Sequence, residues 1–499
     1  MLYVSTRGKT EMVSSAHAIS SGLASDGGLF VPRDFPPVTR AEIDAMCDVS
    51  YEDRAVSVLS RFLTDYSEDE LRECVGAAYS KEKFGSFPAP LHLLKKDVDV
   101  LELWHGPTCA FKDMALQILP HFLTKAIVKT GEQKKVVILV ATSGDTGKAA
   151  MAGFADVPDT EVIVFYPHGG VSAVQELQMT TQRGANVHAV AVEGNFDDAQ
   201  TGVKMLFGKE DLNNLLSENG CAFSSANSIN WGRLVPQIVY YFSSYADAVK
   251  AGRIKNGTKI NFSVPTGNFG DILAGYYAKL MGLPVNKFIC ASNTNNVLTD
   301  FINTGTYNRN RPFYKTISPS MDILVSSNLE RLLYEKSDHN AAKVTEWMNS
   351  LKEKGTYSVG NEMQSAILND FFGTWVDEIE TKETISDVFA NYGYTMDPHT
   401  AVAYKALEKY RLMTSDTTYT IVLSTASPFK FNDVVLSAIN PDKYEGAKLE
   451  PFEAMKRLAE VTGLEIPKSM EELPELEVHK SDIVEPASME AEVKKLLGI

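Results

Sequence analysis

The order of apolar segments constrains the fold of this chain most. Between about residues 98 and 300, segments of helical spacing alternate with short runs rich in β-branched residues, at 136–140, 162–166, 187–192, 260–264 and 288–291. Such alternation indicates parallel sheets covered by helices on both faces. Because ligands bind beyond the carboxyl ends of the strands in such sheets, the loops that follow strands are the candidate functional segments.

The segments on either side have a different pattern. Residues 1–95 show a short opening strand and then helical spacing, with Ser67 and Glu70 placed for a capping box. The chain from about residue 440 is rich in Glu and Lys. We therefore predict a helical amino-terminal domain over 1–95, an α/β core of two subdomains over 96–440 and a helical tail over 441–499.

Composition excludes several classes of protein. The net charge of -16 argues against a nucleic-acid partner. Five cysteines are scattered without a C-x-x-C pair, so we expect reduced thiols, with neither a zinc site nor any other metal site. No apolar run has the length of a signal peptide or a membrane span, which predicts a cytoplasmic protein without a membrane partner. We also expect a monomer or a homodimer.

Lys112 is the residue of greatest chemical interest. A strand predicted over residues 98–104 is broken by a turn, and helical spacing begins at Ala110. The lysine thus lies near the positive end of a helix dipole and is half-desolvated by Phe111 and Trp104, and both effects disfavour its ammonium form. A neutral amine is what Schiff-base chemistry needs. The alternative is a surface lysine in the first turn of a helix.

Three loops after predicted strands are candidate binding segments. Residues 141–148 and 265–271 each place glycines between a strand and a helix amino terminus, where free N–H groups can bind an anion. Neither loop is a Walker motif, and each could instead be a tight turn. The third loop, residues 424–431, follows a strand predicted over 418–423.

Taken together, these segments resemble the threonine synthase family. The resemblance is carried by residues 105–113, 141–147, 264–271 and 424–431, and extends to 3–8, 26–32 and 227–233. It implies an α/β protein with two parallel-sheet domains of the tryptophan-synthase-β-like (fold type II) pyridoxal-phosphate enzymes and a mainly helical amino-terminal portion. The implied reaction converts O-phospho-L-homoserine and water to L-threonine and phosphate.

The resemblance also implies roles for single residues. Lys112 would hold pyridoxal 5'-phosphate as an internal aldimine and move protons at the α and β carbons. The cofactor phosphate would bind at a helix amino terminus, and the hydroxyl of Thr425 would face the pyridine nitrogen. The residues implied to hold that phosphate are Gly267, Asn268, Phe269 and Gly270.

The substrate is implied to bind elsewhere in the matched motifs. Its α-carboxylate would bind the loop of Ser143, Gly144, Asp145 and Thr146, in which we assign Asp145 to shaping the loop. Its phosphate needs cationic or helix-terminal partners. The candidates are Thr108, Lys148 and Arg233, with a salt-bridged structural role as the alternative for each.

Some alternatives stay open. Many relatives have His where this chain has Ser427, and His399 could take over its role or could be a structural hydrogen-bonding residue. The motifs do not separate a threonine synthase from a pyridoxal-phosphate-dependent phospho-lyase that gives 2-oxobutyrate from the same substrate. A binding protein without turnover would leave the intact lysine unexplained, and a nucleotide-binding protein would need a G-x-G-x-x-G or Walker motif.

Overall fold

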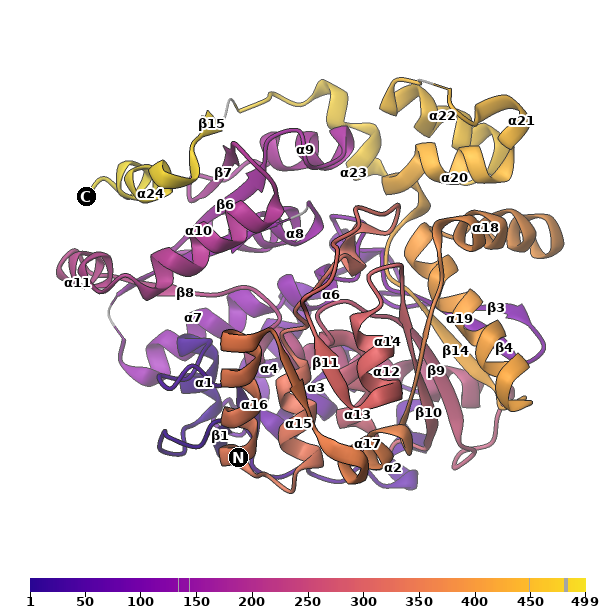
Figure 1. The fold of residues 1–499 in the computed structure, drawn as a ribbon, viewed down its shortest axis with the longest axis horizontal. Coiled ribbons are helices and arrows are strands. Elements are labelled where there is room, and N and C mark those ends of the chain that lie inside the picture. Colours follow the sequence, from indigo (N-terminus) through magenta and orange to yellow (C-terminus); the bar gives the residue numbers. More distant parts are fainter. Residues whose placement is uncertain (133, 143, 448, 480–482) are drawn as a thin grey trace.

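The described part of the chain has two main sheets, of which the larger lies in the lower half of Figure 1. In the computed structural model, which describes residues 1–499 except 133, 143, 448 and 480–482, the larger sheet has six strands in the order β13-β10-β9-β14-β4-β3 (Figure 1). Neighbouring strands are parallel except for the antiparallel pair β3 and β4 at one edge. The strands are β3 (Leu91–Lys95), β4 (Val98–Glu102), β9 (Ile260–Pro265), β10 (Val285–Ser292), β13 (Phe371–Trp375) and β14 (Thr420–Ser424).

The smaller sheet is entirely parallel, with five strands in the order β15-β7-β6-β5-β8. Its strands are β5 (Lys135–Ala141), β6 (Thr160–Pro167), β7 (Val187–Val192), β8 (Cys221–Ser224) and β15 (Ile483–Val484). These two sheets confirm the predicted α/β class with two parallel-sheet domains. The five predicted runs all form strands, whereas β8, β13 and β15 are additional strands that are short and partly exposed, so they lack a strong apolar signal.

The amino-terminal portion is mainly helical, as predicted. Strands β1 (Tyr3–Ser5) and β2 (Phe30–Pro32) pair antiparallel, and the capping box of Ser67 and Glu70 is present at α4. Residues 91–95, which the prediction places in this portion, form the edge strand β3 of the larger sheet. The predicted boundaries at 95 and 440 stay predictions.

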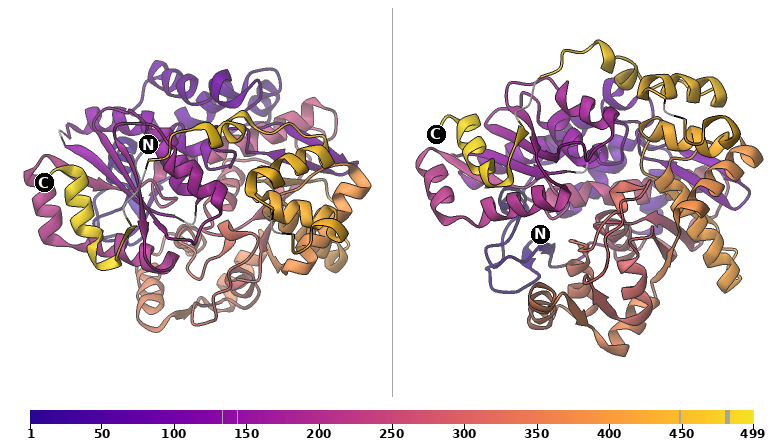
Figure 2. Two further views of the ribbon diagram at one scale, coloured as in Figure 1. Left: turned by 90° about the horizontal axis from the view of Figure 1, so that it is seen from above. Right: turned by 45° about the horizontal axis from the view of Figure 1, so that its top comes forward.

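Helices cover both sheets and link them (Figures 1 and 2). The α-helices are α1 (Ser15–Ser21), α2 (Arg40–Met46), α3 (Tyr51–Phe62), α4 (Glu68–Ala78), α5 (Lys81–Phe84), α6 (Asp113–Leu116), α7 (Leu119–Thr130), α8 (Asp145–Phe154), α9 (Ala173–Thr180), α10 (Phe196–Gly208), α11 (Glu210–Glu218), α12 (Trp231–Lys250), α13 (Gly270–Leu280), α14 (Val297–Thr304), α15 (Leu329–Lys336), α16 (Ala341–Lys354), α17 (Gly360–Leu368), α18 (Glu378–Tyr392), α19 (Pro398–Thr414), α20 (Asn432–Ile439), α21 (Pro441–Tyr444), α22 (Pro451–Thr462), α23 (Lys468–Glu471) and α24 (Met489–Leu497). A short hairpin of β11 (Thr306–Asn308) and β12 (Thr356–Ser358) and the 3₁₀ turns η1 (Pro319–Met321), η2 (Pro428–Phe431), η3 (Leu473–Glu475) and η4 (Pro486–Ser488) complete the described elements.

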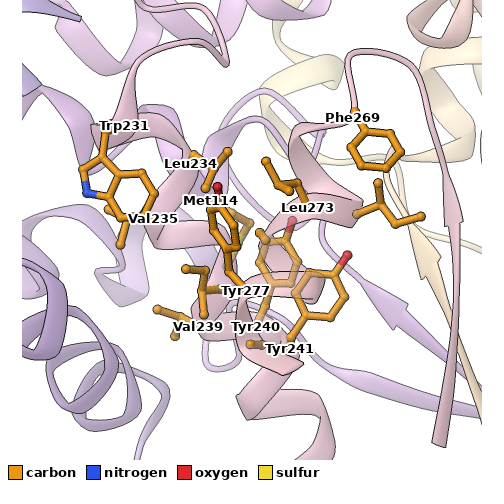
Figure 3. Close-up of a cluster of buried hydrophobic side chains, with 14 of the residues drawn as sticks. Met114, Trp231, Leu234, Val235, Val239, Tyr240, Tyr241, Phe269, Leu273 and Tyr277 are labelled. Atoms are coloured by element: carbon orange, nitrogen blue, oxygen red, sulfur yellow. The ribbon is translucent and has the colours of Figure 1, made fainter. Parts of the chain in front are cut away.

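Helix α12 forms the centre of the core. It is buried along nearly its whole length, and the buried residues include polar side chains such as Arg233 and Gln237 as well as apolar ones. Figure 3 shows its side chains Trp231, Tyr240 and Tyr241 packed with Tyr277 of α13. The core therefore fixes α13 directly, and the amino terminus of α13 is where the candidate site begins.

The carboxyl-terminal segment reaches both sheets. Helices α20 and α22 pack on each other, α20 also packs on α18, and the chain then crosses to the smaller sheet, where β15 pairs with β7. Helix α24 follows and packs on α10, with Met489 so close to Gly202 that a Cβ at that glycine would overlap the methionine sulfur. No helix in the described part of the chain is both long and apolar enough for a membrane span.

Candidate active site

A cavity of about 650 Å³ lies where strands of both sheets end. Segments that follow β5, β9 and β14 line it, together with α10, α12 and the turn η1. This is the edge at which ligands bind in open parallel sheets, and the volume is that of a small-molecule site. The three loops predicted from the sequence therefore meet at one cavity.

Lys112 lies at this cavity as the residue that caps α6. It is only 8% exposed, and its Nζ lies 3.2 Å from Ser320 Oγ, 3.4 Å from Asp145 Oδ2 and 4.9 Å from the centroid of the Phe111 ring. Burial lowers the pKa of Lys112, as predicted, while Asp145 opposes that shift.

Trp104, which was predicted to help desolvate Lys112, is not among the residues that line the cavity. Its ring stacks on His105 at 4.3 Å, and its Nε1 donates to Ser424 Oγ at 3.0 Å. The indole is drawn toward the end of β14 because the buried serine hydroxyl offers its N–H an acceptor.

Asp145 is the electrostatic centre of the site. Its Oδ1 lies 2.8 Å from Nζ of Lys430, a fully buried lysine on η2, and accepts a hydrogen bond from Gln175 at 3.0 Å. Burial alone raises the pKa of Asp145, but Lys430 and Lys112 together hold it far below its usual value. The carboxylate is thus a fixed negative charge, and it faces Lys112, although the sequence prediction gave it only a role in shaping the loop.

The 108–113 turn is closed by a second buried carboxylate. Asp113 accepts hydrogen bonds from the Thr108 backbone N–H at 2.7 Å and from the Thr108 hydroxyl at 2.8 Å. Burial raises the pKa of Asp113 to about 6. Lys430 donates to the Thr108 carbonyl at 2.9 Å, so the same lysine holds this turn beside Asp145.

The loop between β9 and α13, residues 267–270, forms a cup at the start of the helix. Phe269 caps α13 in the left-handed region at φ 63°, which turns the chain sharply into the helix. Gly267 packs so closely on η1 that a Cβ there would lie 2.6 Å from the Ser320 carbonyl oxygen. The carbonyl of Asn268 accepts from Asn328, so the carbonyl is held outward and the first N–H groups of α13 are left for a ligand.

A further carboxylate lies beneath this cup. Asp271 Oδ1 accepts hydrogen bonds from the hydroxyls of Tyr240 at 2.6 Å and Tyr241 at 2.8 Å, while its Oδ2 is buried without a partner among the described residues. Burial raises the pKa of Asp271 to about 6. Figure 3 shows both tyrosines on the core side of Phe269.

Arg233 lines the cavity from the first turn of α12 and is 6% exposed. Its Nη1 donates to the Ala226 carbonyl at 2.7 Å, and no carboxylate in the described part of the chain pairs with it. Burial lowers its pKa to about 10. A buried guanidinium without a carboxylate is costly, so an anion in the cavity would complete it.

His399 also lines the cavity and orients η1. Its Nδ1 lies 2.7 Å from Asp397 Oδ1, and its Nε2 accepts a hydrogen bond from the Ser320 backbone N–H at 3.2 Å. These partners assign the proton to Nδ1. His399 is therefore a structural hydrogen-bonding residue that also lines the cavity, whereas Ser427 is buried outside the lining. That His399 takes over the role of the missing imidazole stays a prediction.

The structure brings some predicted residues together and separates others. Lys112, the cup, Asp145, Thr146, Arg233 and Thr425 line the cavity. Thr108, Gly144 and Lys148 are outside its lining: the Lys148 Nζ donates to Gln182 at 2.5 Å, and burial lowers its pKa to about 8. Ser143 lies outside the described residues.

Sequence reasoning missed Ser320 and the charge pairing of Lys430. Ser320 follows a proline in a turn without strand or helix periodicity, so only its contacts identify it. Lys430 lies within the predicted third loop, but its long reach to Asp145 cannot be read from local sequence. The described residues contain no cluster of His, Cys, Asp and Glu that could hold a metal ion.

Three family models match the chain in succession. They describe the threonine synthase N terminus at residues 2–79, pyridoxal-phosphate dependent enzymes at residues 88–425 and the threonine synthase C-terminal region at residues 400–485.

Known proteins are similar over most of the chain. Threonine synthase of Schizosaccharomyces pombe is 41% identical over 88% of this chain and 89% of its own length. Human threonine synthase-like 1 is 41% identical over 85% of this chain, and the chain spans 58% of that protein's length.

Two solved structures have the same fold. The pyridoxal-phosphate-bound threonine synthase from Brucella melitensis has a TM-score of 0.87 at 36% identity, covering 99% of both chains. Threonine synthase from yeast has a TM-score of 0.87 at 34% identity, covering 100% of this chain and 99% of the other.

Proposed function

This chain belongs to the threonine synthase family of pyridoxal-phosphate-dependent enzymes, and we propose that it is a lyase that converts O-phospho-L-homoserine and water to L-threonine and phosphate. One observation supports this proposal above the others. A single cavity holds a buried lysine amine, a helix amino terminus and a buried guanidinium without a carboxylate partner among the described residues. The reaction needs an amine and sites for two phosphates, and the cavity offers a group for each.

The residues present fit pyridoxal 5'-phosphate. The cup at the start of α13 offers backbone N–H groups, and Gly267 lets the backbone come close to η1. Thr425 lines the cavity, and its hydroxyl has no hydrogen-bond partner in the part of the chain that the structure describes. We therefore assign the cofactor phosphate to residues 267–270, the ring nitrogen to Thr425 and the covalent anchor to Lys112.

When bound, the cofactor withdraws electrons from the substrate carbon that carries the amine. The chain's own contribution at that carbon is proton transfer by Lys112, since burial favours its neutral form, which can act as a base. Asp145 lies 3.4 Å from the same nitrogen and stabilises the protonated form that follows. Burial and Asp145 thus act on the pKa of Lys112 in opposite directions, which suits a group that both accepts and returns protons.

Arg233 is our candidate for the substrate phosphate. It is the one of the three predicted phosphate ligands whose side chain lines the cavity, among residues that the structure describes. Its planar guanidinium can donate two parallel hydrogen bonds to a phosphate group, and its buried position strengthens that interaction. The substrate carboxylate is assigned to the start of α8, where Thr146 lines the cavity.

We also propose that the enzyme works in the cytoplasm, as a monomer or a homodimer. The five cysteines are free and buried, which suits a reducing compartment.

The direct test is to incubate the purified protein with pyridoxal phosphate and O-phospho-L-homoserine and to quantify threonine, phosphate and 2-oxobutyrate. We expect threonine and phosphate in equal amounts, a visible absorbance band, and loss of both in Lys112→Ala. A matched control is Lys468→Ala, since the Lys468 side chain is 85% exposed. Formation of 2-oxobutyrate would move the protein to the phospho-lyases, and absence of the band in the wild type would refute the cofactor assignment.

A further inference from the structure

Two side chains surround the amine of Lys112 and belong to different parts of the chain. Ser320 Oγ lies 3.2 Å from Nζ, and Asp145 Oδ2 lies 3.4 Å from it. The serine hydroxyl itself lies 3.3 Å from Asp145 Oδ2. The three groups form a closed triangle in which Ser320 can accept from the lysine and donate to the carboxylate at the same time.

We propose that Ser320 is a further catalytic residue, which together with Asp145 binds the ε-ammonium of Lys112 whenever that side chain carries the proton it moves. This inference rests on the proposed function, since it assumes that Lys112 is the base. In this step the substrate C–H bond breaks, its electron pair stays on the carbon, and the Nζ lone pair forms a new N–H bond with the proton. That N–H bond breaks again when the proton is returned.

Asp145 is held in its charged form by a second lysine. Lys430 is fully buried and binds the other carboxylate oxygen at 2.8 Å, so Oδ1 is occupied and Oδ2 alone faces Lys112. Lys430 also donates to the carbonyl of Thr108 and to the side chain of Gln178, which fixes its own position. Asp145 is thus a charged counter-ion with one oxygen bound to Lys430 and the other directed at Lys112 and Ser320.

Ser320 is held in place through its backbone. His399 accepts the Ser320 N–H, and Asp397 holds the imidazole from the other side at 2.7 Å. His399 and Asp397 are 1% and 0% exposed, and Asp397 caps α19. The long helix α19 therefore orients the serine, and the Ser320 hydroxyl remains free for Lys112.

Other charged groups act on Lys112 from neighbouring elements. Arg233 of α12 and Lys430 of η2 disfavour its ammonium form, whereas Asp145 of α8 favours it, and Lys112 in turn lowers the pKa of Asp271 on α13. Burial lowers the pKa of Lys112 most and the two cations lower it further, so the ammonium form needs a compensating group. The Ser320–Asp145 pair supplies that compensation at contact distance.

The test measures the rate of adduct formation and the rate of turnover, which we expect to change in opposite directions. The pH dependence of adduct formation between the apoprotein and pyridoxal phosphate reports the loss of the Lys112 proton, and turnover reports its use as a base. In Ser320→Ala we expect the adduct midpoint to move to lower pH, with about threefold or faster labelling below that midpoint and about tenfold slower turnover, since hydrogen bonds to charged groups are the stronger ones. Asp145→Asn should move the midpoint further in the same direction.

Two variants make the result specific. Ser320→Thr keeps the hydroxyl and should restore both rates, and Ser318→Ala removes a buried hydroxyl from the same turn that binds Asn293 but not Lys112, so both rates should stay as in the wild type. An unchanged midpoint in Ser320→Ala, or a parallel fall of both rates, would overturn the inference. Failure of the wild type to form the adduct would instead refute the proposed function.

Discussion

Replacing Gly267 by alanine tests how closely the proposed phosphate-binding loop packs on the turn that carries Ser320. The added Cβ would lie 2.6 Å from the Ser320 carbonyl oxygen and 3.4 Å from Met321 Cα. Because the nearest atom belongs to the backbone, it cannot rotate away, and either the cup or η1 must shift. Overpacking of this kind costs about 1–3 kcal/mol.

The cost should appear mainly in cofactor affinity. The empty loop can relieve the contact by moving, whereas a loop that binds phosphate through its N–H groups cannot, so we expect about 5- to 150-fold weaker binding of pyridoxal phosphate. The assay is a titration of the apoprotein followed by absorbance and intrinsic fluorescence, with thermal unfolding of the apoprotein measured in parallel. We expect the melting temperature of the apoprotein to fall much less than the affinity.

Two other glycines calibrate this prediction. A Cβ at Gly270 would lie 3.3 Å from a side-chain carbon of Ser228, so Gly270→Ala should weaken binding less. A Cβ at Gly76, on an exposed part of α4, meets nothing within 4 Å, and Gly76→Ala should leave binding unchanged. Wild-type affinity in Gly267→Ala would refute the packing argument.

Three further changes give separate expectations. Arg233→Gln should raise the KM for O-phospho-L-homoserine about tenfold or more while pyridoxal phosphate binding changes little, and an equal loss of both would contradict its assignment to the substrate. Asp271→Asn should raise the free energy of unfolding of the apoprotein at pH 7.5 by up to about 3 kcal/mol, because a carboxyl whose folded-state pKa is raised from 3.8 to about 6 destabilises the fold above pH 6. This gain in stability should shrink as the pH falls from 6 to 4. A gain that stays constant with pH would show that the charge of Asp271 is not its cause. Met489→Ala should lower the free energy of unfolding by about 2–5 kcal/mol, since this buried side chain packs on Gly202 of the cavity-lining helix α10. We expect the same variant to weaken substrate binding. A loss of stability with unchanged substrate binding would show that α24 does not influence the site.

The strand and loop units could be predicted from sequence because their signals are local. An apolar run followed by glycines and helical spacing is complete within about twenty residues, which is why the loop at 265–271 between a strand and a helix and the position of Lys112 at a helix start were both predicted correctly. The capping box at Ser67 has the same local character.

What the sequence did not reveal depends on long-range contacts. Ser320 becomes important only because η1 packs on the cup, and Asp145 receives its charge partner from Lys430, far along the chain. Trp104 was expected beside Lys112 from its nearness in sequence, but it turns to Ser424 on another strand. These contacts depend on tertiary packing, which a local sequence pattern does not predict.

The order of strands in the two sheets has a consequence for how the protein is made. Strand β4, which leads into the Lys112 turn, pairs with β14 from residues 420–424, and the edge of the smaller sheet is completed by β15 at residues 483–484. A ribosome releases these partners only near the end of synthesis, so the nascent chain carries the Lys112 turn for most of its translation without the strand that pairs with β4. We expect the cofactor to be captured after release, and premature termination before β14 to leave a chain that exposes sheet edges and depends on chaperones.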